Sequence, residues 1–192
     1  GSHTFSCGLA HLCGFTTVKE AMDDKYFSTY LTSLMMQEIV PAITNDQISS
    51  ELAKEFASKV IDRYRNPHIE HQWLSIGVQY SSKMRMRNAP VISRYYQQFG
   101  TTPELMAFGF AAFLVFMKSE KGEDGKFEGN AHGKNYTIND DNISLITDKR
   151  KHSFTTMAFV EEMLADVNLW GHDLSNFPGF ANKVTSMITL LE

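Results

Sequence analysis

Apolar side chains recur at helical spacing along most of this 192-residue chain. From Lys25 to Val40 they repeat three or four residues apart, and Pro41 follows the run. From Ile48 to Tyr64 they form one stripe with the charged residues largely off it, which predicts an amphipathic helix. No stretch shows sustained two-residue alternation or the strand–helix rhythm of a nucleotide-binding sheet. The pattern therefore predicts an all-α domain, a helical bundle, over residues 1–192.

Local capping patterns mark several helix starts. Thr17 with Glu20, and Thr44 with Gln47, have the form of a capping box, in which side chains satisfy the free backbone N–H groups of a first turn. Asn66-Pro67 joins a good N-cap residue to a proline, which is favoured at the first helical position. We therefore expect a further helix to begin there.

The centre of the bundle is predicted in the second half of the chain. Thr102-Pro103-Glu104 has the order of a helix start, and the helix that follows, to about Lys118, is apolar on nearly every face. Such a helix must be surrounded by others. Its apolar run is too short to span a bilayer, and the start of the sequence lacks the basic and apolar regions of a signal peptide. We expect no membrane segment and a cytoplasmic location.

The region after this central helix is polar before it becomes helical again. Lys121 to Asn142 is rich in Gly, Asp, Asn and Lys, which predicts an exposed connection, with a short hairpin around Tyr136 and Ile138. Helical patterns resume at Phe154 to Leu169 and at Phe177 to Leu191.

Composition limits the possible classes of function. Hydrophobic residues make up 43% of the chain and aromatic residues 12%, which is enough for a sizeable core and excludes a disordered or fibrous protein. A net charge of -4 lacks the basic footprint of nucleic-acid binding, so we expect no nucleic-acid partner. Cys7 and Cys13 do not have metal-ligand spacing. His68 and His71 could converge, but no cysteine or acidic cluster supplies further zinc ligands, so we expect no metal site.

Basic and imidazole groups are concentrated in residues 63–87. His71 could hydrogen-bond a hydroxylated or carboxylated ligand, or it could form a surface pair with His68. Lys83 and Arg87 are four residues apart and share a helix face, so the two cations could meet a carboxylate or phosphate. The alternative for this pair is a solvated basic face.

The order of the motifs resembles a known family. The residues that carry the resemblance are Arg63-Tyr64-Arg65-Asn66-Pro67, His71-Gln72-Trp73-Leu74-Ser75-Ile76 and Ser82-Lys83-x-Arg85-x-Arg87, preceded by Gly1-Ser2-His3-Thr4 and Gly14-Phe15-x-Thr17-Val18-x-Glu20-Ala21-Met22. Together they resemble the C-terminal domain of the mannitol dehydrogenase family, the polyol-specific long-chain dehydrogenases. The central motif resembles most closely the tagaturonate reductase branch of that family.

The resemblance implies an enzyme of two parts. An N-terminal Rossmann-type domain binds NAD, and a helical C-terminal domain, similar to that of 6-phosphogluconate dehydrogenase, helps to bind the substrate; residues 1–192 match only the second part. The family's catalytic pattern is Lys-x4-Asn-x2-His, and His3 matches the histidine, which orients the substrate. The lysine, which is the general acid–base, and the asparagine would precede Gly1. The candidate substrate-binding residues are Asn66, His71, Lys83 and Arg87.

The branch implies the NADH-dependent reduction of D-tagaturonate, a sugar acid, to D-altronate. Two alternatives stay open: another member of the family, such as fructuronate reductase or a mannitol or arabinitol dehydrogenase, or a helical interaction module without catalytic activity. Gly1-Ser2-His3 also matches the remnant of a cleaved affinity tag, which is a second interpretation of His3. Without its partner domain the chain should be inactive and should expose apolar surface.

Overall fold

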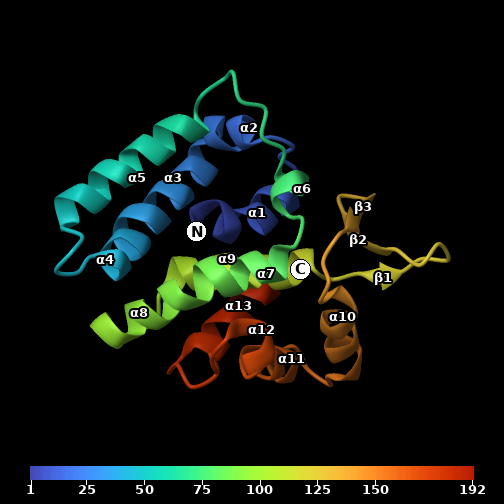
Figure 1. Ribbon diagram of the computed structural model, residues 1–192. Coiled ribbons are helices and arrows are strands. Elements are labelled where there is room, and N and C mark those ends of the chain that lie inside the picture. Colours follow the sequence, from blue (N-terminus) through green and yellow to red (C-terminus); the bar gives the residue numbers. More distant parts are fainter.

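Helices make up most of the computed structural model, which describes residues 1–192 (Figure 1). The α-helices are α1 (Ser2–Leu12), α2 (Val18–Asp23), α3 (Lys25–Ser33), α4 (Val40–Ile43), α5 (Ser50–Tyr64), α6 (Trp73–Ile76), α7 (Tyr80–Lys83), α8 (Ala89–Phe99), α9 (Glu104–Phe116), α10 (Ile143–His152), α11 (Thr156–Leu164), α12 (Val167–Trp170) and α13 (Phe180–Leu191). Two π-helical segments are η1 (Leu34–Ile39) and η2 (Met84–Asn88). One small antiparallel sheet contains β1 (Glu120–Lys121), β2 (Phe127–Ala131) and β3 (Lys134–Ile138). The predicted helical fold class is confirmed.

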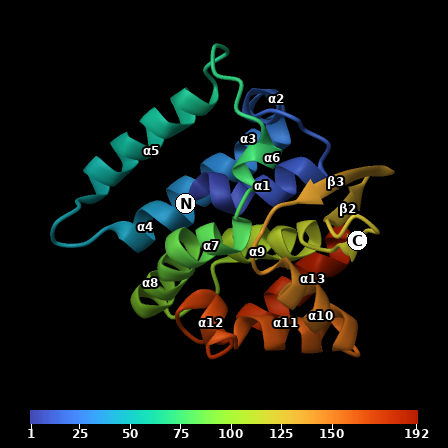
Figure 2. The same cartoon turned by 45° about the vertical axis from the view of Figure 1, so that its right-hand side comes forward.

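Helix α9 lies at the centre, as its all-round apolar sequence predicts. It packs against α1 on one side and α13 on the other (Figures 1 and 2). Two glycines let α1 and α9 approach closely. A methyl group on Gly8 would lie 2.6 Å from the Ala112 carbonyl oxygen, and one on Gly109 would lie 2.7 Å from the Phe5 carbonyl oxygen. The crossing of α1 over α9 therefore depends on these two missing side chains.

The start of α9 is capped by a residue distant in sequence. The N-cap position is Pro103, which has no side-chain capping bond, and Thr102 does not cap the helix as expected. Instead the Thr102 hydroxyl donates to the Pro178 carbonyl at 3.1 Å. The carboxylate of Glu38, buried on η1, accepts hydrogen bonds from the backbone N–H groups of Leu105 and Met106 at 2.8 and 2.7 Å. This contact places a negative charge at the positive end of the α9 dipole.

Both π-helical segments come just before a proline inside a continuing helix. Segment η1 precedes Pro41 in α4, and η2 precedes Pro90 in α8. A proline lacks the N–H group that would bond to the previous turn, and its ring crowds the carbonyl there. A widened turn accommodates both effects. The helix predicted over Lys25 to Val40 therefore does not stop at Pro41 but continues to Ile43.

The helix predicted to begin at Asn66-Pro67 is wrong. Residues 66–72 form a loop, and the Asn66 side chain accepts a hydrogen bond from the His68 N–H at 2.9 Å in a local turn. The backbone of this loop pairs instead with the start of α2 and the residues just before it: the N–H group of Val18, the first residue of α2, donates to the His71 carbonyl at 2.9 Å, and Thr17 forms a bridge with Gln72. Helix begins again only at Trp73, whose side chain is fully buried. Long-range pairing has satisfied the backbone groups that a helix would have used.

The capping box predicted from local sequence is confirmed at α2, whereas the one predicted before α5 is wrong. The Thr17–Glu20 capping box forms in full. Helix α5 starts later than the Thr44–Gln47 pattern predicts, because Ser49 is its N-cap and accepts from the Leu52 N–H at 3.2 Å.

The apolar stripe of α5 is divided between the core and the surface. The small residues Ala53 and Ala57 are buried, together with Ile61 and Tyr64 at the C-terminal end of the helix. The large side chains of Leu52 and Phe56 lie on the surface, 56% and 64% exposed.

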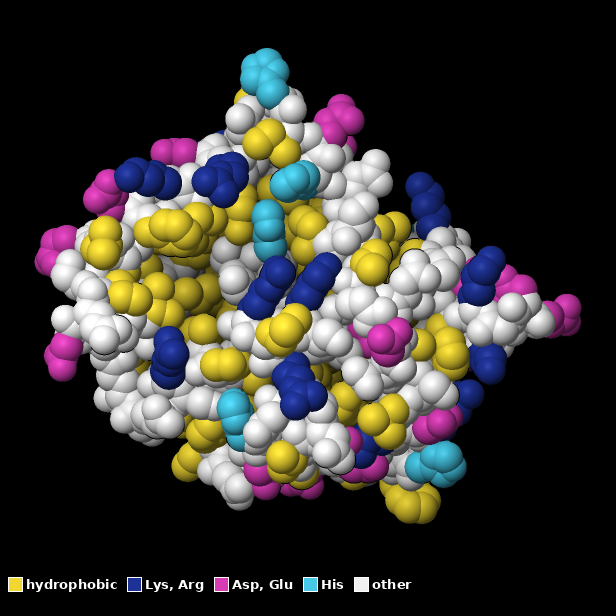
Figure 3. Space-filling model, viewed as in Figure 1, with side chains coloured by type: hydrophobic (Ala, Val, Ile, Leu, Met, Phe, Trp, Pro, Cys, Tyr) yellow, Lys and Arg dark blue, Asp and Glu magenta, His cyan; other side chains and the backbone are white.

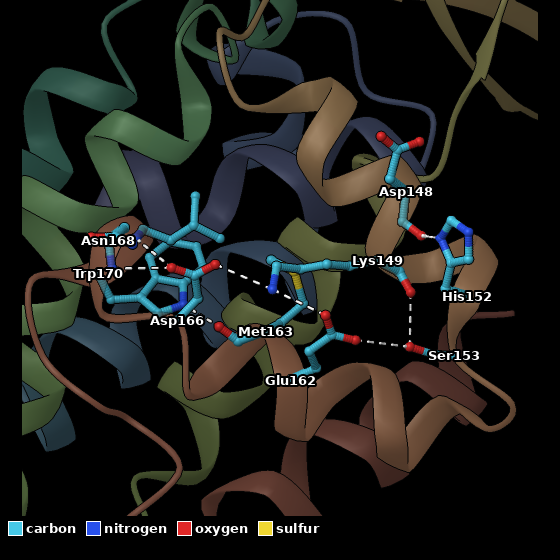
Figure 4. A network of polar contacts seen from close by, with 10 residues as sticks. Asp148, Lys149, His152, Ser153, Glu162, Met163, Asp166, Asn168 and Trp170 are labelled. Atoms are coloured by element: carbon cyan, nitrogen blue, oxygen red, sulfur yellow. Dashed lines mark hydrogen bonds and ion pairs between the residues drawn. The ribbon is translucent and has the colours of Figure 1, made fainter.

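The small sheet and helices α10 to α13 follow α9 in the chain. The expected hairpin forms between β2 and β3, where Gly129 pairs with Tyr136. The pattern did not predict helix α10, because its sequence is mostly polar and basic. This helix lies between two of the segments in which we predicted helices. Lys149 holds it to its neighbours by ion pairs to Glu162 of α11 at 3.1 Å and to Asp166, the N-cap of α12, at 3.2 Å (Figure 4). None of the helices is both long and apolar enough to cross a membrane.

Candidate functional site

His3 lies in the first turn of α1 among aromatic rings. Its imidazole stacks on Tyr64 of α5, with ring centroids 3.8 Å apart and an interplanar angle of 11°. The Trp73 ring lies nearly perpendicular to the imidazole, with ring centroids 5.7 Å apart, and the centroid of the His71 ring is 6.2 Å away. The Tyr64 hydroxyl is itself fixed by a 2.9 Å hydrogen bond with Ser2. The orientation of His3 is therefore held from three separate elements of the fold.

The environment keeps His3 neutral. Burial, followed by nearby positive charges that include those of His71 and Arg87, lowers its pKa to about 3. Its Nε2 atom is buried and has no hydrogen-bond partner within the chain. A neutral imidazole with a free ring nitrogen can donate to or accept from one polar group of a ligand.

Arg87 belongs to η2, and its backbone lies next to the start of α1. Its carbonyl oxygen is 3.5 Å from where a Cβ of Gly1 would lie. The guanidinium is exposed and takes part in no hydrogen bond or ion pair within residues 1–192. It therefore brings an uncompensated positive charge close to His3.

The other two candidates are placed differently. Lys83 is half-buried one turn before Arg87, and its ammonium group donates to the Ile76 carbonyl at 2.8 Å. It is near enough to Cys7 to oppose the rise in that thiol's pKa, which burial takes to about 12. Asn66 is occupied in the turn of its own loop. The structure thus brings His3, His71 and Arg87 together and leaves Asn66 outside this cluster.

A cavity of about 290 Å³ adjoins the two histidines. Its lining consists of His3, Val18, Val60, Arg63, Tyr64, Ile69 and His71. Sequence reasoning did not single out Tyr64 or Arg63 individually, although both belong to the motif that precedes Asn66. Their roles depend on where α5 ends relative to α1, which no local pattern reports.

A larger cavity lies elsewhere and contains none of the candidates. It has a volume of about 500 Å³ and lies between the end of α1 and the β2–β3 hairpin, with His11, His132 and Tyr136 in its lining. His11 packs edge-on against Tyr136 with centroids 4.4 Å apart. The His132 ring nitrogen is bonded to the Leu12 carbonyl at 2.8 Å. Size alone does not decide which cavity is the reactive site. Lys134 lines the larger cavity and Arg63 the smaller one, but only the smaller one contains His3, the histidine that the family pattern implies.

The fold is that of the helical domain of sugar-alcohol dehydrogenases. The structure aligns over its full length with 36% of Pseudomonas fluorescens mannitol 2-dehydrogenase, solved as a ternary complex with NAD and D-mannitol, at a TM-score of 0.79 and 23% identity. It also aligns with a D-sorbitol dehydrogenase in substrate-free form, at a TM-score of 0.67 and 17% identity, over 99% of this chain and 36% of the other.

Residues 1–191 match the family described as the mannitol dehydrogenase C-terminal domain, and the chain belongs to that family. It is 34% identical to an altronate oxidoreductase from Yersinia pestis over 98% of its own length and 38% of the relative's. An altronate oxidoreductase from Escherichia coli is 31% identical over 97% of this chain and 37% of that protein. The chain therefore spans less than two fifths of these relatives, and it matches their C-terminal portion.

Proposed function

We propose that residues 1–192 form the substrate-binding domain of an NAD-dependent altronate oxidoreductase, which reduces D-tagaturonate to D-altronate reversibly. The observation that carries the proposal is that His3 and His71 line one cavity, while the positive charge of Arg87 is near enough to His3 to lower its pKa. The names of the curated relatives support the uronate rather than a neutral polyol as substrate.

The chemistry of the cluster suits a sugar acid. Neutral His3 would hydrogen-bond the oxygen at the reacting carbon or a neighbouring hydroxyl, and so orient the substrate. Arg87 would pair with the substrate carboxylate, because an exposed guanidinium without a partner can make two parallel N–H···O bonds. Lys83 would add a second positive charge nearby, and His71 would contact a hydroxyl. Asn66 would need to leave its local turn in order to contribute.

The cofactor would be held mainly outside this chain. The three strands pair only in antiparallel fashion, and no Gly-x-Gly-x-x-Gly turn leads from a strand into a helix, which supports a dinucleotide site outside these residues. We propose that an N-terminal Rossmann domain of the same protein binds NAD, which supplies the hydride. The lysine general acid–base implied by the family would belong to the residues before Gly1. Residues 1–192 alone would then be inactive.

Steady-state kinetics of the full-length protein test this function. We expect NADH oxidation with D-tagaturonate, and none by residues 1–192 alone under the same conditions. Arg87→Ala should raise KM for tagaturonate by roughly 10- to 100-fold, because a charge-assisted bidentate contact contributes about 1.5–3 kcal/mol. Arg94→Ala, at an exposed position on α8, is the matched control and should leave KM unchanged. Equal losses in the two variants would contradict the role given to Arg87.

One alternative has a specific observation in its favour. The structural neighbours are a mannitol and a sorbitol dehydrogenase, which act on neutral polyols by their names. A full-length protein that prefers mannitol, sorbitol or arabinitol to sugar acids would support this alternative. Fructuronate reductase would be indicated by a preference for fructuronate over tagaturonate.

A further inference from the structure

One side of α5 carries a row of apolar side chains that no part of residues 1–192 covers. Leu52 and Phe56 are 56% and 64% exposed, and Val60 follows one turn later, half-buried. The spacing of four residues aligns the three along one side of the helix. Single exposed apolar residues are common on proteins, but a continuous row of them marks an interaction surface. Leu52, Phe56 and Val60 are called the α5 apolar row below.

The α5 apolar row ends at the candidate site. Val60 lines the same cavity as His3 and His71. Figure 3 shows histidine, lysine and arginine side chains gathered on one face, and beside them a hollowed hydrophobic area where α5 and its neighbours lie in Figure 1. Any body that covers the row would therefore reach the edge of the cavity and reduce its contact with water.

We propose that the α5 apolar row is the docking surface for the N-terminal, nucleotide-binding domain of the same polypeptide. This inference rests on the proposed function. The chain spans 38% of the length of its altronate oxidoreductase relatives, which leaves ample sequence for a second domain. Residues 1–192 match the C-terminal portion of these relatives, so the second domain would join the chain at α1, which carries His3. A second copy of residues 1–192 would bring no nucleotide-binding wall to this cavity.

Hydroxyl-radical footprinting of the full-length protein tests the docking without reference to any substrate. Phe154 is the internal control, because it is a phenylalanine 101% exposed in the loop before α11 and outside the candidate site. The two rings would oxidise at similar rates if Phe56 were open to solvent. We expect oxidation of Phe56 to be at least about fivefold slower than that of Phe154, at any protein concentration. Equal rates would overturn the proposal, and so would protection that disappears on dilution, which would indicate a second copy as the occupant.

A pair of charge substitutions provides an independent measurement. Phe56→Glu in the full-length protein should lower kcat/KM at least tenfold and speed proteolysis between the domains. The melting of the helical domain should stay unchanged, because Phe56 packs little against it. Phe154→Glu should have none of these effects. Wild-type kcat/KM and proteolysis in Phe56→Glu would overturn the proposal.

The two proposals fail separately. If the wild-type protein does not act on tagaturonate while Phe56 is protected, the assigned reaction is wrong and the docking surface stands. If it acts on tagaturonate while Phe56 and Phe154 oxidise equally fast, only the docking surface is wrong.

Discussion

Replacing Gly8 by alanine should disturb the helix crossing on which the site is built. The added methyl carbon would lie 2.6 Å from the Ala112 carbonyl oxygen and 2.9 Å from the Ala112 carbonyl carbon. Both neighbours are backbone atoms of α9, which is buried along its length, so no side chain can rotate away. Helix α1 would have to move outward by roughly 0.8 Å to restore an ordinary contact.

The expected loss of stability follows from two opposing effects. Overpacking of a closely packed interior costs about 1–3 kcal/mol, and a clash with backbone belongs at the upper end of that range. Alanine is a better helix former than glycine by about 1 kcal/mol, which offsets part of the loss. Gly8→Ala should therefore reduce the free energy of unfolding by about 2 kcal/mol. For a domain of this size that corresponds to a fall in Tm of about 4–8 °C.

Ser6→Ala is the matched control on the same helix. Ser6 is fully buried, and its hydroxyl has no hydrogen-bond partner, so alanine removes an unsatisfied polar group. Its stability should be unchanged or higher by about 1 kcal/mol. Urea unfolding followed by circular dichroism measures both variants. A Gly8→Ala protein within about 0.5 kcal/mol of wild type would refute the close approach, and equal losses in both variants would show that α1 tolerates no change.

Two further effects concern charged or titrating groups. Glu38→Ala should lower the free energy of unfolding by about 2–4 kcal/mol, because two N–H groups at the start of α9 lose a charged acceptor; Glu38→Gln, which keeps one acceptor oxygen, should lose less in the same melting experiment. Burial, followed by nearby positive charge, lowers the pKa of His3 to about 3, so the folded protein binds this proton more weakly than the unfolded chain. The stability contributed by neutral His3 is therefore complete above its ordinary pKa and declines as the pH falls toward 3. Between pH 7 and pH 5 wild type should lose up to about 2 kcal/mol more than His3→Gln, and parallel pH profiles of the two proteins would contradict the burial of the imidazole.

Several features of this protein were determined by local sequence alone. The apolar faces of α9 require other helices around it, wherever they come from in the chain. The Thr17–Glu20 capping box closes within one turn, so it needs no tertiary partner. The order of motifs from Arg63 to Arg87 was sufficient to indicate the family, because a family signature is a property of sequence.

Other features were decided only when distant segments met. Asn66-Pro67 has the residues of a helix start, yet the backbone of the loop that follows pairs with Thr17 and Val18 at the start of α2, and those contacts outweigh a local preference. The free N–H groups of α9 are capped by Glu38, 67 residues earlier than Leu105, which no sequence window contains.

The candidate site shows the same division. The sequence motifs indicated His3, His71, Lys83 and Arg87 as candidate site residues. The stacking of His3 on Tyr64, however, depends on how α1 and α5 pack. Likewise, the pattern of α5 identified an apolar stripe without saying which part of it faces the core. The small alanines took that place because they allow close packing, and this left Leu52 and Phe56 at the surface. Periodicity reports that a side chain is apolar, whereas only the assembled fold determines what covers it.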